Sequence, residues 1–174
     1  MWAKMYFTGN SDPDNNCNAN RTQLCMAGST TMNIPSGEYY FDRALMANYG
    51  STAIAGDDVF LYFVNGAHID SRGSATFGFT APDWEIYPGY FPGVFMYSER
   101  GNTAEFNWNG STSSESEGII YLPNSRLNMG GSSRGKVFTG QMIADSFDLG
   151  GANATTVEFY EYVENEAPLV YLVE

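Results

Sequence analysis

Four aromatic side chains in one short, proline-rich segment are the residues best suited to bind a ligand. Residues 80–93 contain Trp84, Tyr87, Tyr90 and Phe91, spaced by two prolines. A patch of large aromatic rings is costly to leave in water, so the segment either contacts a partner or packs on the body of the protein as a secondary core. Sugar rings or another protein would fit such a ridge. The sequence therefore makes these four residues the candidate ligand-binding site.

A polar stretch over residues 9–29 offers oxygen ligands for a cation. Asp12, Asp14 and Asn16 follow each other at the spacing of the first ligands of a calcium loop, and a net charge of −12 favours a hard cation. The stretch then departs from that pattern, because Cys17 stands where an EF-hand has glycine and Gln23 stands where it has a bidentate glutamate. A solvated acidic loop is the competing interpretation, and no other cofactor is expected.

The same stretch holds the two cysteines of the chain, Cys17 and Cys25. A disulfide between them would close a small loop and would place the protein in an oxidising compartment. A pair of unpaired thiols is the alternative, although it suits a polar loop poorly. With one histidine and no second cysteine pair, a zinc site is not supported.

Catalytic patterns are scarce. His68 is the only histidine available as a base for a serine or cysteine nucleophile, and no nucleophile elbow, phosphate-binding loop or dinucleotide fingerprint occurs. Glycoside hydrolysis needs only two carboxyl groups at a suitable distance, so a glycan-active enzyme stays an alternative. The carboxylates that could supply the pair are Asp57, Asp58, Asp70, Glu105, Glu115, Glu117, Asp145 and Asp148. We expect a protein that is not an enzyme.

The amino-acid composition limits the classes of partner that this protein can bind. A chain of 174 residues forms one domain, 1–174, and its 20 acidic against 8 basic residues repel nucleic acids and anionic lipids. No run of about 18 apolar residues occurs, so attachment to a membrane is expected only through an anchor outside these residues.

An internal repeat indicates which elements position these residues. Four segments share the order apolar, Asn or Asp, two variable residues, Gly, small residue; they begin at Ile69, Phe106, Leu127 and Phe147. A short apolar run precedes each one: 59–62, 94–97, 119–122 and 142–145. Each copy therefore contains two short strands, and the later copies recur every 20 to 25 residues.

This period predicts an all-β fold, a parallel β-solenoid in which each strand stacks on its copy in the next coil. Alternate apolar positions would face the core, and the Asn or Asp between them would face outward or form a polar ladder. Residues 80–93 lengthen one turn by about a dozen residues as an aromatic insertion, and residues 156–174 are expected to close the solenoid as a C-terminal hairpin. An antiparallel β-sandwich is the alternative.

Several ordered motifs over about residues 33–160 resemble one family. Pro35 to Phe41, Ala55 to Phe63 and Phe79 to Pro82, followed by segments that begin at Gly93, Glu117 and Gly140, are similar to TadG-like proteins of the tight-adherence (Flp) pilus assembly system. The 9–29 loop and the aromatic insertion have no counterpart in that pattern.

The resemblance implies a bacterial extracellular or cell-surface domain with a structural or adhesive role in pilus assembly or attachment. It implies no catalytic residues. The expected partners are other surface or pilus proteins, or a polysaccharide, for which a polysaccharide-binding module is the alternative function.

Overall fold

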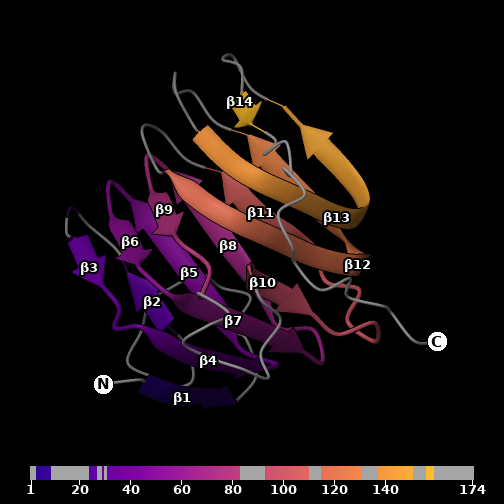
Figure 1. The fold of residues 1–174 in the computed structure, drawn as a ribbon, viewed down its shortest axis with the longest axis horizontal. Helices are drawn as coiled ribbons and strands as arrows, with labels where there is room; N and C mark the ends of the chain where they lie inside the picture. The colour runs from indigo at the N-terminus through magenta and orange to yellow at the C-terminus, as the bar shows by residue number, and fades with distance from the viewer. Residues whose placement is uncertain are drawn as a thin grey trace, which may run out of the picture.

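Parallel strand pairing dominates the computed structural model of the protein (Figure 1). The structure describes residues 3–8, 24–26, 29, 31–82, 93–109, 115–130, 137–150 and 156–158. In this part of the chain every element is a β-strand. The strands are β1 (Ala3–Thr8), β2 (Leu24–Met26), β3 (Thr31–Asn33), β4 (Gly37–Asp42), β5 (Leu45–Gly50), β6 (Ala53–Gly56), β7 (Val59–Val64), β8 (His68–Gly73), β9 (Thr76–Phe79), β10 (Val94–Ser98), β11 (Phe106–Asn109), β12 (Ser116–Gly130), β13 (Val137–Leu149) and β14 (Thr156–Glu158).

These strands form the coils of a β-solenoid, which confirms the predicted fold class. Strands β1, β4, β7, β10 and the first half of β12 follow one another on a face that we call the A face. Strands β2, β5, β8, β11 and the second half of β12 make the B face, and β3, β6 and β9 make a third, shorter one. In Figure 1, β12 and β13 are long bent ribbons that run from the A face onto the B face.

Register confirms the repeat that begins at Ile69. Asp70 pairs with Asn107, Asn107 pairs in turn across β11 and β12 with Asn128, and Asn128 pairs with Asp148. Leu61 and Met96 are paired although 35 residues separate them, against the 22 residues that separate the paired Tyr39 and Leu61. The extra residues fall between β9 and β10, within the predicted insertion 80–93.

Aromatic rings fill much of the core. Phe41 and Phe63 stack with centroids 4.8 Å apart, and the Trp108 ring meets Phe77 and Phe95 edge to face, each at 5.9 Å. All five are buried, and Phe41, Phe63 and Phe77 alternate along their strands with residues that are less buried. Stacking of equivalent side chains on successive coils therefore builds the core column by column.

Polar side chains tie the coils at the corner between the A and B faces. The buried Asn102 donates from Nδ2 to the carbonyl oxygen of Ala67 in the coil before (2.8 Å) and accepts from the backbone N–H of Ala104 (3.1 Å). Its own carbonyl oxygen accepts from Oγ of Ser125 in the coil after (2.9 Å). These bonds satisfy buried polar groups that the turn would otherwise leave without partners.

The ends of the solenoid expose apolar side chains. Among the described residues, the large hydrophobic side chains that are exposed all lie on β1 or β13: Met5, Tyr6, Ile143, Phe147 and Leu149. Of the predicted C-terminal hairpin, the structure describes only β14, which pairs in parallel with β13 and so continues the solenoid. The rest of 156–174 lies outside the described residues.

Candidate functional site

A column of tyrosines runs along the outer side of the A face. Register places Tyr6, Tyr40, Tyr62, Tyr97 and Tyr121 side by side on β1, β4, β7, β10 and β12. We call these five residues the tyrosine ladder. On β4, β7 and β12 the ladder tyrosine is flanked by buried side chains of the core, such as Leu61 and Phe63 around Tyr62, so these tyrosines point away from the core.

The rings of the ladder contact one another along its whole length. Tyr6 and Tyr40 stack with centroids 5.0 Å apart and planes 17° apart, and Tyr97 and Tyr121 stack at 5.4 Å and 18°. Tyr62 lies between these two pairs, edge to face with Tyr40 (5.5 Å, 83°) and tilted against Tyr97 (5.3 Å, 36°). The change from stacked to edge-to-face geometry between Tyr40 and Tyr62 interrupts the stack.

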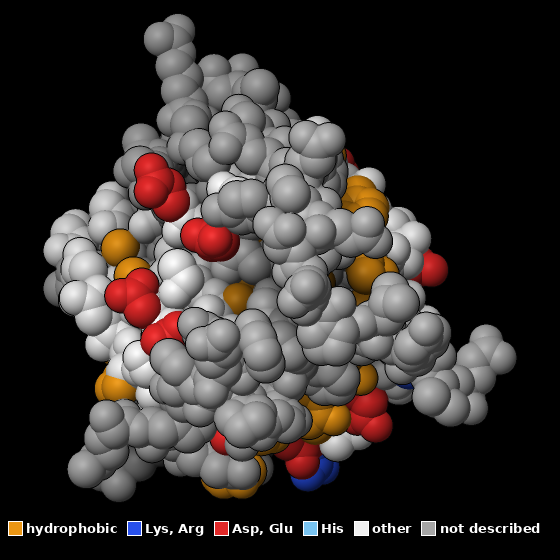
Figure 2. All heavy atoms as spheres, viewed as in Figure 1, with side chains coloured by type: hydrophobic (Ala, Val, Ile, Leu, Met, Phe, Trp, Pro, Cys, Tyr) orange, Lys and Arg blue, Asp and Glu red, His pale blue; other side chains and the backbone are white. Residues whose placement is uncertain are grey.

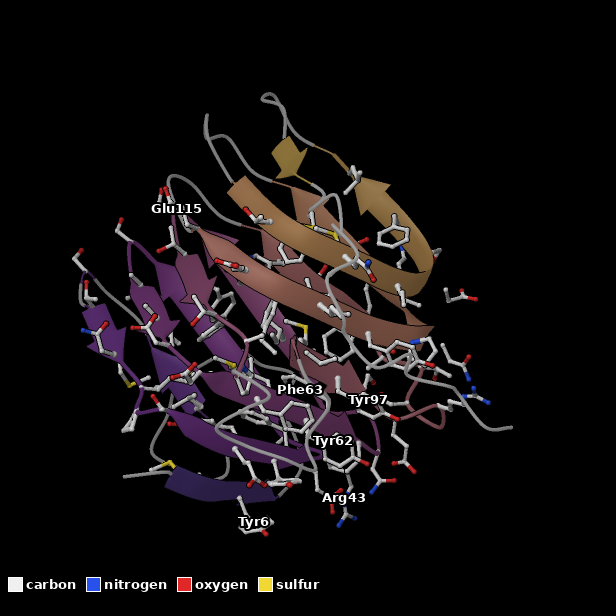
Figure 3. All side chains as sticks on the ribbon, viewed as in Figure 1. Tyr6, Arg43, Tyr62, Phe63, Tyr97 and Glu115 are labelled. Carbon is white, nitrogen blue, oxygen red and sulfur yellow. The ribbon has the colours of Figure 1, made fainter. Side chains whose placement is uncertain are left out.

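Exposure differs along the ladder. Tyr6, at the N-terminal end, is 64% exposed, whereas the other four rings are half-buried by their neighbours. Figure 3 shows Tyr6 beyond β1 at this end of the sheet, with Tyr62 and Tyr97 further along on β7 and β10. The column thus forms a continuous strip of phenol rings in contact, one on each strand, at the strand spacing of about 4.8 Å.

Burial and nearby charge raise the pKa of two ladder phenols, Tyr62 and Tyr97. Burial raises the pKa of Tyr62 above its ordinary value, and the negative charge of Glu99 raises it further. Burial also raises the pKa of Tyr97, with a further rise from Tyr121 and an opposing effect of the Arg100 guanidinium. Tyr62 and Tyr97 therefore stay protonated to a higher pH than a free tyrosine does, and a protonated phenol can both donate and accept hydrogen bonds.

Two carboxylates, of Glu38 and Glu99, and the guanidinium of Arg100 lie beside this strip. Tyr40 donates a 2.5 Å hydrogen bond from its hydroxyl to Oε2 of Glu38, which is only 2% exposed. Figure 2 shows several carboxylate side chains and very few Lys or Arg side chains among the described residues on the visible face. With a net charge of −12, the surface favours neutral or cationic ligands over anionic ones.

A second ladder, of Asp and Asn, lies on the outer side of the B face, as the repeat predicted. Asn128 donates from Nδ2 to Oδ1 of Asn107 (2.8 Å) and also to the Glu105 carboxylate, and Arg126 binds Asp148 at 2.7 Å. The ladder carries its two carboxylates at its ends, Asp70 and Asp148, three strand spacings or about 14 Å apart. That separation exceeds the roughly 5–9.5 Å that a glycosidase pair uses.

Most of the site residues predicted from the sequence lie outside the described residues. Trp84, Tyr87, Tyr90 and Phe91 lie outside the described residues, as do Asp12, Asp14, Asn16 and Cys17. Cys25 lies half-buried on β2, so the disulfide and the calcium site remain predictions. Among the residues that are described, no three His, Cys, Asp or Glu side chains gather in a way that could hold a metal ion.

The sequence analysis does not predict the tyrosine ladder, although three of its tyrosines lie in the repeated apolar segments. Segments 59–62, 94–97 and 119–122 were grouped as equivalent, which places Tyr121 one position ahead of Tyr62 and Tyr97. The register shifts between Val94 and Met96, where β10 bulges against β12, and this shift restores Tyr121 to the column. Aligning the tyrosines themselves, instead of the apolar runs, would have found it.

Comparison with family models, with curated proteins and with solved structures finds no match for this chain. Over the part of the chain that is described, no helix is long and apolar enough to cross a membrane.

Proposed function

We propose that this protein is a non-enzymatic attachment domain of a bacterial cell surface, and that its tyrosine ladder binds an extended, neutral or cationic polysaccharide. The observation that carries the proposal is the unbroken contact of five tyrosines over five successive strands of the A face. The surface location and a link to pilus assembly come from the sequence resemblance alone.

The ladder suits an extended glycan for geometric reasons. A β-1,4-linked chain is flat and presents hydroxyl groups and C–H surfaces at a regular interval, and the ladder presents one phenol ring per strand at a regular interval. Tyrosine supplies an apolar body and a polar tip on a side chain with few rotatable bonds, so little conformational entropy is lost on binding. Several weak contacts on one rigid strip add up through effective concentration.

Charge narrows the ligand class. Glu99 lies close enough to the phenols of Tyr62 and Tyr97 to raise the pKa of both. An anionic polysaccharide would meet this carboxylate and a net charge of −12, whereas a neutral glucan or an amino-sugar polymer would not be repelled. We therefore expect binding to cello- or chito-type chains over acidic ones.

The test is isothermal titration of the full chain with soluble cello- and chito-oligosaccharides. Tyr62→Ala and Tyr97→Ala should each lower the affinity, by roughly tenfold, because each removes a ring at the centre of the contact. Thr31→Ala, an exposed change on the third face, should leave it unchanged.

The variant Trp84→Ala shows whether the ladder or the aromatic insertion is the binding site. If binding survives both ladder variants and is lost in Trp84→Ala, the insertion is the site and the ladder proposal is wrong. If no saccharide binds, the ladder is not a glycan site, and a protein partner becomes the better hypothesis for the attachment role.

A further inference from the structure

The N-terminal end of the tyrosine ladder combines three features that together suit radical chemistry. Tyr6 is 64% exposed and stacks on Tyr40 with centroids 5.0 Å apart. Tyr40 donates its hydroxyl hydrogen to Oε2 of Glu38 at 2.5 Å, and Glu38 is 2% exposed. An accessible phenol, a stacked second phenol and a hydrogen-bonded proton acceptor thus lie within one strand spacing.

The short bond to Glu38 matters because a phenol that loses an electron must also lose its proton. The oxidised phenol is a strong acid, and the neutral phenoxyl radical forms readily only where an acceptor is already in place. A 2.5 Å O–H···O contact is typical of a phenol bound to a carboxylate, within reach for direct proton transfer. Burial of Glu38 keeps water from competing for that bond.

We propose that Tyr6 and Tyr40 form a site of oxidative cross-linking, in which Glu38 accepts the phenolic proton of Tyr40. A peroxidase-type oxidant that uses hydrogen peroxide removes one electron from each phenol. The proton of Tyr6 goes to solvent and that of Tyr40 goes to Glu38 and then to solvent, and the two electrons and two protons reduce the peroxide to two molecules of water. The two phenoxyl radicals join through a carbon–carbon bond between the ring carbons ortho to the oxygens. The hydrogens on those carbons then move to the oxygens, which restores two phenols.

Strand pairing holds the two rings together for this reaction. Tyr6 and Tyr40 are register partners on adjacent parallel strands, so both rings leave the sheet in the same direction. The planes are 17° apart in the stack and must hinge about the new bond, a motion that the exposure of Tyr6 permits. The cross-link would fasten the terminal strand β1 to β4 and so fix the first coil on the second.

Other contacts in the ladder provide internal comparisons. Tyr97 and Tyr121 are stacked in a similar way at 5.4 Å and 18°, but both rings are half-buried. Tyr40 and Tyr62 meet edge to face at 83°. We therefore expect the Tyr6–Tyr40 product to form first.

The experiment treats the full chain with horseradish-type peroxidase and hydrogen peroxide and follows dityrosine fluorescence, with mass spectrometry of the digested product. The expected product joins the peptides of Tyr6 and Tyr40, is lighter by two hydrogens, and forms at a rate that does not depend on protein concentration. Tyr6→Phe should abolish this peptide, whereas Tyr121→Phe, the matched control at the other end, should leave it.

Glu38→Gln tests the proton acceptor with the stacked pair retained. Circular dichroism establishes that the variant is folded, and the initial rate of the Tyr6–Tyr40 cross-link should fall by at least about tenfold. An unchanged rate would contradict the role of Glu38. A cross-link that appears only between molecules, or dityrosine that forms without the Tyr6–Tyr40 peptide, would overturn the site itself, and neither result depends on whether the ladder binds a polysaccharide.

Discussion

At the scale of single residues, the ladder tyrosines link ionisation to stability. Burial raises the pKa of Tyr62 and of Tyr97 in the folded protein, while the unfolded chain keeps values near 10. Between these values the unfolded state loses protons that the folded state retains. Their contribution to the free energy of unfolding is therefore fully present below pH 10 and is lost as the pH rises through the folded pKa.

This linkage predicts alkaline destabilisation that depends on the ladder. The melting temperature of the protein should be insensitive to these groups up to about pH 9 and should fall above about pH 10. The double variant Tyr62→Phe/Tyr97→Phe should flatten that fall, because phenylalanine does not ionise. Thermal melts in buffers from neutral to alkaline pH measure it, and an equally steep fall in the variant would show that other groups control the alkaline limit.

At the scale of strands, glycine permits the close approach of neighbouring coils at the start of the A face. Gly118 and Gly140 are register partners on β12 and β13, with φ angles of 132° and 144°. A Cβ atom on Gly140 would lie 1.8 Å from the carbonyl oxygen of Gly118, which is backbone and cannot rotate away. Both the conformation and the space exclude larger residues here.

Three alanine variants separate these two effects. Gly140→Ala should lower the free energy of unfolding by about 3 kcal/mol or more, since it adds strain and a backbone clash. Gly66→Ala, at φ 86° with open space around it, should cost about 1 kcal/mol from conformation alone. Gly101→Ala, which has open space and no such φ, should be nearly neutral. Urea unfolding of the three variants measures the order, and equal losses would contradict this account.

The same scale shows what the sequence could predict. The repeat period and the alternation of apolar residues were sufficient to predict the solenoid and the Asp70–Asn107–Asn128–Asp148 ladder. An in-register parallel repeat places equivalent residues side by side. The tyrosine ladder was not predicted. The bulge near Val94 shifts the register between β10 and β12, and the hydrophobicity pattern of the sequence does not reveal such a shift. A hydrogen bond such as Tyr40 to Glu38 depends on side-chain rotamers, which no sequence pattern specifies.

At the scale of the whole molecule, the solenoid arranges equivalent side chains of successive coils in a line on its surface. Tyr6 to Tyr121 covers four strand spacings, about 19 Å, on a sheet whose strands all pair in parallel. A ligand that follows this line gains one contact per coil until it has passed the last tyrosine. Affinity should therefore depend on ligand length in a way that a single pocket would not produce.

The most direct measurement of the central claim is titration calorimetry with a length series of cello- and chito-oligosaccharides, from the disaccharide to the octasaccharide. The account predicts that affinity rises with each added sugar until the chain spans about 19 Å and then levels off. It also predicts that Tyr62→Ala, which interrupts the ladder at its centre, removes the dependence on length. Affinity that does not change with length, or a dependence on length that persists in Tyr62→Ala, would contradict the assignment of the tyrosine ladder as the binding surface.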